Sequence, residues 1–185
     1  MSTLIDSYSE ANGSVYYVLI PTYGFLSVGQ SFHNIEQMTL NSCKFYLNKY
    51  GSPSGNMYAL LYAHSGTFGS SSVATGSVLA TSSPINANTV SGAGLIEFTF
   101  DGSYKMSPDT NYVILCNFNN GDVDNYIMVG VDNSLPVEHE GNVVTNDGSW
   151  GYDSAVDCLF YVYGTLQNPT ISGISTIQGI STITL

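Results

Sequence analysis

The sequence contains no arginine, only three lysines and no long apolar run. Its 14 acidic residues outnumber Lys44, Lys49 and Lys105, which gives a formal net charge of −11. Nucleic acids and anionic membrane surfaces are bound through cationic side chains, so neither is expected as a partner. No run of about 18 or more apolar residues occurs, and we therefore expect no membrane span.

Secretory signals are also missing from the first residues. The stretch MSTLIDSYSE has neither a basic region nor an apolar core, so no signal peptide is predicted. An extracellular location would then require that a signal was removed, or that the protein is carried outside as part of a virus particle. With so few cations, most carboxylates must stand in water, support turns or bind a hard cation such as calcium.

Catalytic motifs and zinc-binding spacings are absent. No CxxC, HExxH or GxSxG pattern is present, and we predict a protein without enzymatic activity. Two carboxylates of a glycosidase would be invisible in sequence, and the candidates by elimination are Glu36, Glu97 and Asp101. The three cysteines lie within apolar runs and are expected to be buried thiols, with one disulfide and a spare thiol as the alternative: Cys43, Cys116 and Cys158.

The residues that are abundant favour β structure. Apolar residues make up 43% and aromatic residues 12% of the chain, and 19 glycines accompany many Ser, Thr and Asn residues. Within 95–100, Ile96, Phe98 and Phe100 would face one side while Leu95, Glu97 and Thr99 face the other, which indicates a strand with one buried face. Similar runs occupy 15–20, 25–33, 43–47, 57–63, 77–81, 95–100, 112–118, 126–132 and 158–164. We predict an all-β, two-sheet antiparallel sandwich of the jelly-roll type over residues 1–164.

Residues 165–185 form an extended repeat tail. Isoleucine recurs at every third position, as Ile171, Ile174, Ile177, Ile180 and Ile183, a period that suits neither a helix nor a core-facing strand. Such a row needs neighbours in order to be buried, so we predict an attachment or trimerising stem and a homo-oligomer. A Ser/Thr/Gly linker and a strand donated to a neighbouring sheet are the alternatives.

Three segments resemble a known domain family. They are LNKYGSPSGNMYALLYAHSGTFGSSSVATGSVLATS (47–82), NYVILCNFNNGDVDNYIMVGVD (111–132) and the closing DGSW…DCLFYVYG (147–164). Together they resemble the jelly-roll choice-of-anchor domains of surface-exposed and phage-associated proteins, over roughly residues 25–164. The resemblance implies a sandwich like a carbohydrate-binding module on a cell or virion exterior, with no catalytic motif.

Two acidic segments are candidate calcium sites. In NNGDVDN (119–125), short oxygen-bearing side chains at Asp122, Asp124 and Asn125 have a spacing that lets a loop converge on calcium. The alternative is an ordinary turn held by Asx hydrogen bonds. A second candidate pairs Asp153 and Asp157, near the last strand, with Asp6 or Glu10 from the N-terminal region.

His139 lies between two glutamates in VEHEGN. It is interpreted as part of a solvated loop, with a metal ligand or general base as the alternative.

Aromatic residues in a polar loop suggest a ligand site. Trp150, the only tryptophan, lies in NDGSWGYD (146–153) with Asn146, Asp147 and Tyr152, and Tyr126 is a further candidate. The alternative is that Trp150 packs back against the sandwich edge. We therefore predict a non-catalytic, surface-displayed binding or adhesion module that recognises a glycan. The competing hypothesis is a structural virion or extracellular subunit, such as a decoration or fibre protein, that assembles through its tail.

Overall fold

The computed structural model of the chain describes residues 2–13, 15–134 and 139–167, and the predicted tail residues 168–185 lie outside them. Almost all regular structure is β, apart from two short 3₁₀ turns at Glu10–Asn12 and Ala87–Thr89. The strands are β1 (Thr3–Tyr8), β2 (Val15–Leu19), β3 (Ser27–Asn34), β4 (Met38–Tyr50), β5 (Asn56–Ser65), β6 (Val73–Thr81), β7 (Ile85–Asn86), β8 (Gly94–Thr99), β9 (Lys105–Met106), β10 (Thr110–Asn117), β11 (Tyr126–Asp132), β12 (Val143–Asn146), β13 (Trp150–Asp153), β14 (Asp157–Cys158) and β15 (Phe160–Leu166).

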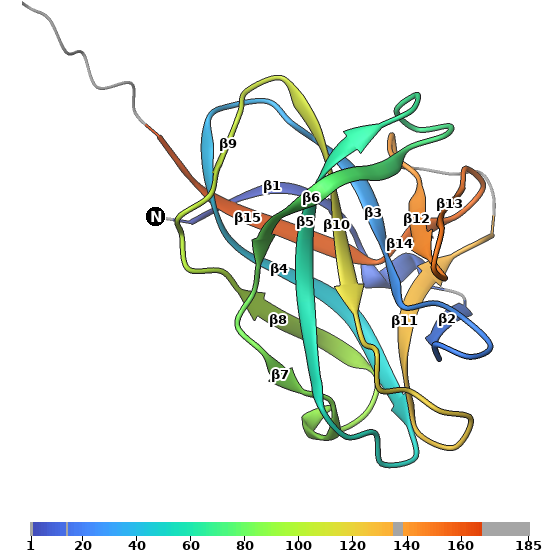
Figure 1. Cartoon of the computed structure of the whole chain (residues 1–185). Coiled ribbons are helices and arrows are strands. Elements are labelled where there is room, and N and C mark those ends of the chain that lie inside the picture. Colours follow the sequence, from blue (N-terminus) through green and yellow to red (C-terminus); the bar gives the residue numbers. More distant parts are fainter. Residues whose placement is uncertain (1, 14, 135–138, 168–185) are drawn as a thin grey trace, which may run out of the picture.

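The strands form two antiparallel sheets that pack face to face (Figure 1). An eight-stranded sheet runs β1-β15-β4-β11-β14, with β8 and β9 paired to β4 and β2 paired to β11. A seven-stranded sheet runs β13-β12-β3-β10-β5-β6, with β7 paired to β5. The predicted all-β, two-sheet antiparallel sandwich is thereby confirmed, and each of the predicted apolar runs overlaps a strand.

The main core lies between the two sheets. Along β4, Cys43, Phe45 and Leu47 point inward and are fully buried, while the intervening side chains point outward. The facing strand β10 contributes Ile114 and Cys116 to the same core. The two-residue period that predicts strands therefore also sorts each strand into a buried and an outward side.

A second, smaller core lies on the outer side of the seven-stranded sheet. It contains Ala74, Val113, Leu115 and Val144, against which Tyr62 and Trp150 pack. Val113 and Leu115 are fully buried although they face away from the main core, because β6 and β13 fold over this part of the sheet.

The two ends of the described sandwich lie side by side. β1 pairs with β15 in antiparallel register, with Thr3 opposite Gly164 and Tyr8 opposite Phe160 (Figure 1). β15 continues to Leu166, opposite Met38, two residues beyond the predicted end at Gly164. The backbone N–H of Gln167 then donates to the carbonyl of Gln37 at 2.9 Å. The tail therefore begins at the same end of the sandwich as β1.

Candidate functional site

Tyrosines gather on the outer side of the eight-stranded sheet. On β4, β11 and β15 they occupy the positions that alternate with core residues, so their rings point away from the sandwich. We call this surface the tyrosine face, and its members are Tyr16, Tyr46, Tyr50, Tyr126, Tyr161 and Tyr163.

The tyrosine face consists of three stacked pairs. The ring centroids of Tyr50 and Tyr126, which are direct cross-strand partners, lie 5.1 Å apart with 18° between the ring planes. Tyr16 and Tyr46 are 6.3 Å apart at the same angle, and Tyr161 and Tyr163 are 6.4 Å apart at 11°. Near-parallel rings fixed on rigid strands form a preorganised aromatic surface, with little side-chain entropy left to lose on binding.

A small hollow opens beside the pair of Tyr16 and Tyr46. Its volume is about 130 Å³, and its lining also includes Glu10, Gly130 and Leu159. Gly130 is the cross-strand partner of Tyr16, and a Cβ atom placed there would lie 2.8 Å from the Tyr46 ring. The missing side chain therefore allows the Tyr46 ring to approach the backbone of β11.

Charged groups flank the tyrosine rings. The hydroxyl of Tyr161 donates to a Glu10 carboxylate oxygen at 2.5 Å, and this hydrogen bond raises the pKa of Tyr161 above its ordinary value. Lys44 lies 5.3 Å from the centroid of the Tyr163 ring and 3.9 Å from a Glu97 carboxylate oxygen. The face thus combines flat apolar rings with a carboxylate and an ammonium group.

The surroundings of Tyr16 also raise the pKa of its hydroxyl group. Burial raises its pKa most, followed by repulsion from and hydrogen bonding to Tyr46. The Tyr16 phenol therefore remains neutral near pH 7, when its hydroxyl can both donate and accept hydrogen bonds.

The predicted ligand residues do not form one site. Trp150 packs edge-on against Tyr62 at 5.1 Å as part of the second core, as the alternative interpretation expected. Tyr152, two residues further along the same strand β13, is 53% exposed. Tyr126 lies on the other sheet, in the tyrosine face.

The loop residues Asn146 and Asp147 mainly organise a turn. Asn146 Oδ1 accepts from the backbone N–H of Gly148, and Asp147 Oδ1 accepts from that of Ser149. Asp147 also lines an open hollow of about 520 Å³ together with Tyr23 and Phe25.

The first calcium candidate is occupied by turn hydrogen bonds. Asp122 Oδ1 accepts from the backbone N–H groups of Asp124 and Asn125 at 2.8 and 2.9 Å. Asn125 Oδ1 accepts from the backbone N–H of Ser52 at 2.8 Å, which ties this turn to the end of β4. These contacts match the Asx-turn interpretation of the segment.

The second calcium candidate is divided between two places. Asp153 accepts from the backbone N–H of Ala155 and from the Tyr17 hydroxyl, whereas Asp157 is buried and bound to Gln30. Among residues 2–13, 15–134 and 139–167, no group of three or more His, Cys, Asp and Glu side chains could hold a metal ion.

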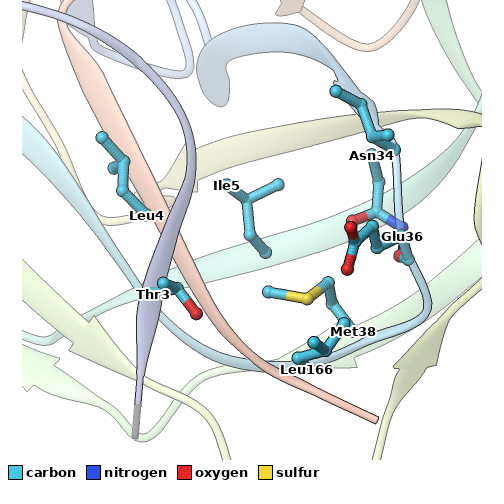
Figure 2. A pocket seen from close by; sticks show the side chains of 8 residues that line it. Thr3, Leu4, Ile5, Asn34, Glu36, Met38 and Leu166 are labelled. Atoms are coloured by element: carbon cyan, nitrogen blue, oxygen red, sulfur yellow. The ribbon is translucent and has the colours of Figure 1, made fainter. Parts of the chain in front are cut away.

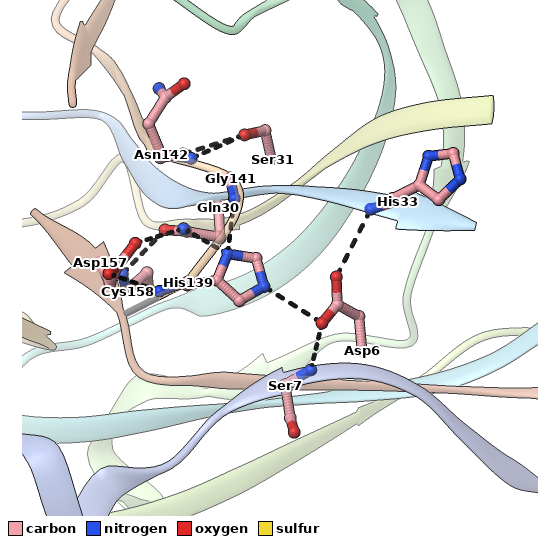
Figure 3. A network of polar contacts seen from close by, with 10 residues as sticks. All are labelled: Asp6, Ser7, Gln30, Ser31, His33, His139, Gly141, Asn142, Asp157 and Cys158. Atoms are coloured by element: carbon pink, nitrogen blue, oxygen red, sulfur yellow. Dashed lines mark hydrogen bonds and ion pairs between the residues drawn. The ribbon is translucent and has the colours of Figure 1, made fainter. Parts of the chain in front are cut away.

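His139 joins three strands through a buried polar network (Figure 3). Its Nδ1 accepts from the backbone N–H of Gly141 at 2.9 Å, so Nε2 carries the proton and donates to Asp6 at 3.1 Å. Gln30 donates to Asp157 and accepts from the backbone N–H of Cys158. The side chain of His139 is only 8% exposed, so the interpretation as a solvated loop is wrong for this residue.

The remaining chemical candidates have separate local roles. Glu97 accepts from Ser42 at 2.8 Å, Asp101 accepts from Ser103, and Glu36 lines a groove near the N-terminus. The predicted buried thiols are confirmed, since all three cysteines are buried and unpaired: Cys43, Cys116 and Cys158. Burial raises the pKa of each thiol, which keeps it protonated and unreactive near pH 7.

Comparison with models of known protein families finds no match, and a search of curated proteins finds no significant relative. The resemblance to choice-of-anchor domains therefore stays a prediction. No helix in the described part of the chain is long and apolar enough to cross a membrane.

Proposed function

We propose that the protein is a non-catalytic, surface-displayed binding module that recognises a glycan through the tyrosine face. The observation that carries this proposal is the set of three stacked tyrosine pairs on one open sheet face, beside a hollow lined by Glu10. Tyrosine rings can pack against the apolar face of a pyranose, while hydroxyl, carboxylate and ammonium groups form hydrogen bonds with the hydroxyl groups of the sugar. The proposed location is a cell or virion exterior.

The net charge of −11 supports a neutral or cationic ligand over an anionic one. Lys44 adds positive charge to the tyrosine face, but the carboxylate of Glu97 lies beside it. We therefore expect neutral oligosaccharides to bind more tightly than sulfated or sialylated ones.

The test is a titration of neutral oligosaccharides, first selected on a glycan array, with the full chain and single variants. Each lost aromatic contact is worth about 0.5–1.5 kcal/mol, so Tyr16→Ala or Tyr161→Ala should weaken binding roughly two- to tenfold. Tyr23→Ala is the matched control, because Tyr23 is a highly exposed tyrosine outside the tyrosine face.

Two outcomes oppose the proposal. A loss of affinity in Trp150→Ala or Tyr152→Ala, with Tyr16→Ala unaffected, places the ligand at the loop predicted from sequence. Absence of binding to every oligosaccharide favours the competing function, a structural subunit. That alternative is supported by exposed apolar side chains at the end of the sandwich where the tail begins.

A further inference from the structure

An apolar groove lies where the tail leaves the sandwich. It has a volume of about 310 Å³ and is bounded by the start of β1, the connection from β3 to β4, and the end of β15. Figure 2 shows Leu4 and Asn34 on opposite sides, with Ile5 and Met38 between them and Leu166 below.

The rim of this groove is unusually apolar for an outer surface. Ile35 is 72% exposed, Leu4 50% and Leu166 46%. Single exposed apolar residues are common, but three that converge on one hollow mark an interaction site. The occupant should therefore supply apolar side chains.

The polar residue Asn34 lies behind this apolar rim. Asn34 is fully buried, and its Nδ2 donates to the carbonyl oxygens of Glu36 and Ser107, each at 2.6 Å. These two acceptors fix the orientation of the amide, and Asn34 Oδ1 accepts no hydrogen bond from the described residues. Because Asn34 Oδ1 is buried even with the groove open, it sets no condition on an occupant, which meets only the apolar rim.

The isoleucine repeat meets the requirement for apolar side chains. Residues 168–185 contain no charged side chain, and isoleucine at every third position alternates with Ser, Thr, Gly and backbone amides that can donate. The last described residues before the repeat lie at the groove, because Leu166 lines it and Gln167 is bonded to Gln37 at its edge.

A second copy of the chain explains the length of the repeat better than the chain's own tail. The groove is at the small end of the range for ligand pockets, about 300–1,000 Å³, so it can hold only part of the repeat. Eighteen residues can extend by about 60 Å, far enough to leave one sandwich and reach another. We infer that the groove receives the isoleucine repeat of a second copy, which makes the protein an oligomer joined by exchanged tails.

The experiment measures the mass of the full chain by light scattering across a concentration series. The groove variant is Ile35→Ser and the tail variant combines I174S, I177S and I180S. Ile35 is mostly exposed, so its replacement should leave folding intact. Val123→Ser is the matched control, an exposed apolar residue in the 119–125 turn, distant in sequence from the groove.

We expect the wild-type chain and Val123→Ser to form oligomers. The groove and tail variants should associate more weakly, so that on dilution they become monomers at a concentration at least tenfold higher than the wild type does. A mixture of the two defective variants should regain dimers, because one supplies an intact tail and the other an intact groove. Glycan titration of the same samples reports separately on the tyrosine face.

Three results overturn the inference. A monomeric wild type rules out exchange, and equal losses of thermal stability in both variants then place the tail in its own groove. An oligomer that survives Ile35→Ser but not the tail variant means that tails associate with one another without the groove. An oligomer that survives both variants uses another surface.

Discussion

Gly130 offers a direct test of how the tyrosine face is built. The residue lies on β11 opposite Tyr16, and its lack of a side chain gives the Tyr46 ring room to lie against the strand. We predict that Gly130→Ala destabilises the protein moderately and also weakens glycan binding, because the added methyl group displaces Tyr46.

The magnitude follows from three distances. A Cβ atom at position 130 would lie 2.8 Å from Tyr46 Cδ1, 3.0 Å from Leu159 Cδ1 and 3.2 Å from the Tyr46 carbonyl oxygen, where ordinary contacts begin at 3.4 Å. The ring must therefore retreat by roughly 0.6 Å. Overpacking of this kind costs about 1–3 kcal/mol, and replacing glycine within a strand recovers about 0.5–1 kcal/mol. The net loss is about 0.5–2 kcal/mol, which lowers Tm by a few degrees.

Gly94→Ala is the matched control. Gly94 begins β8 in the same sheet, and its added Cβ would meet no atom within 4 Å. This variant should gain about 0.5–1 kcal/mol, so the two glycine variants are expected to shift Tm in opposite directions in thermal unfolding followed by circular dichroism. A rise in Tm for Gly130→Ala, equal to that of Gly94→Ala, refutes the proposed packing of Tyr46.

Three further predictions concern the rest of the sandwich. His139→Ala should lower the free energy of unfolding in urea by about 3–5 kcal/mol, because it leaves the buried network of Asp157 and Gln30 incomplete. His64→Ala, at the partly exposed end of β5, should lower it much less. Asp122→Ala should lower Tm equally with EDTA and with calcium if the carboxylate only holds a turn, whereas a loss seen only with calcium supports the predicted metal site. The cysteines should react with a thiol reagent only at the rate of global unfolding, because all three are buried, and fast reaction in native buffer contradicts that burial.

The sandwich could be predicted because alternation and turn residues act locally. Phe98 is buried and Glu97 points outward, as the pattern of 95–100 requires. The boundaries of the strands were harder to predict. β4 starts at Met38, five residues before its predicted run, because hydrogen bonds to β9 and β15 extend it. β1, β12 and β13 were not predicted, since short strands with polar residues depend on partners distant in sequence.

The candidate site was harder to predict, because it depends on strand order. Tyr46 on β4 alternates with core residues, as Tyr161 and Tyr163 do on β15, and this parity was a usable signal in each strand. Their assembly into one face requires the pairing of β15 with β4, which no local pattern contains. Trp150 was predicted to bind a ligand because a lone tryptophan in a polar loop is typical of a binding site. In the structure it packs instead against Tyr62 and the second core.

The groove and the tyrosine face meet along β15, and this has a consequence for binding. Tyr163 and Leu166 belong to the same strand, and Leu4 is the cross-strand partner of Tyr163. Copies joined through the groove should therefore present several tyrosine faces on one particle, and multivalent attachment can exceed single-site affinity by about 10²–10⁴. Ile35→Ser should then reduce binding to a glycan-coated surface while leaving the affinity for a soluble monovalent oligosaccharide unchanged. If Ile35→Ser weakens both surface binding and the affinity for the soluble oligosaccharide, the neighbouring copy must complete the binding site of each tyrosine face.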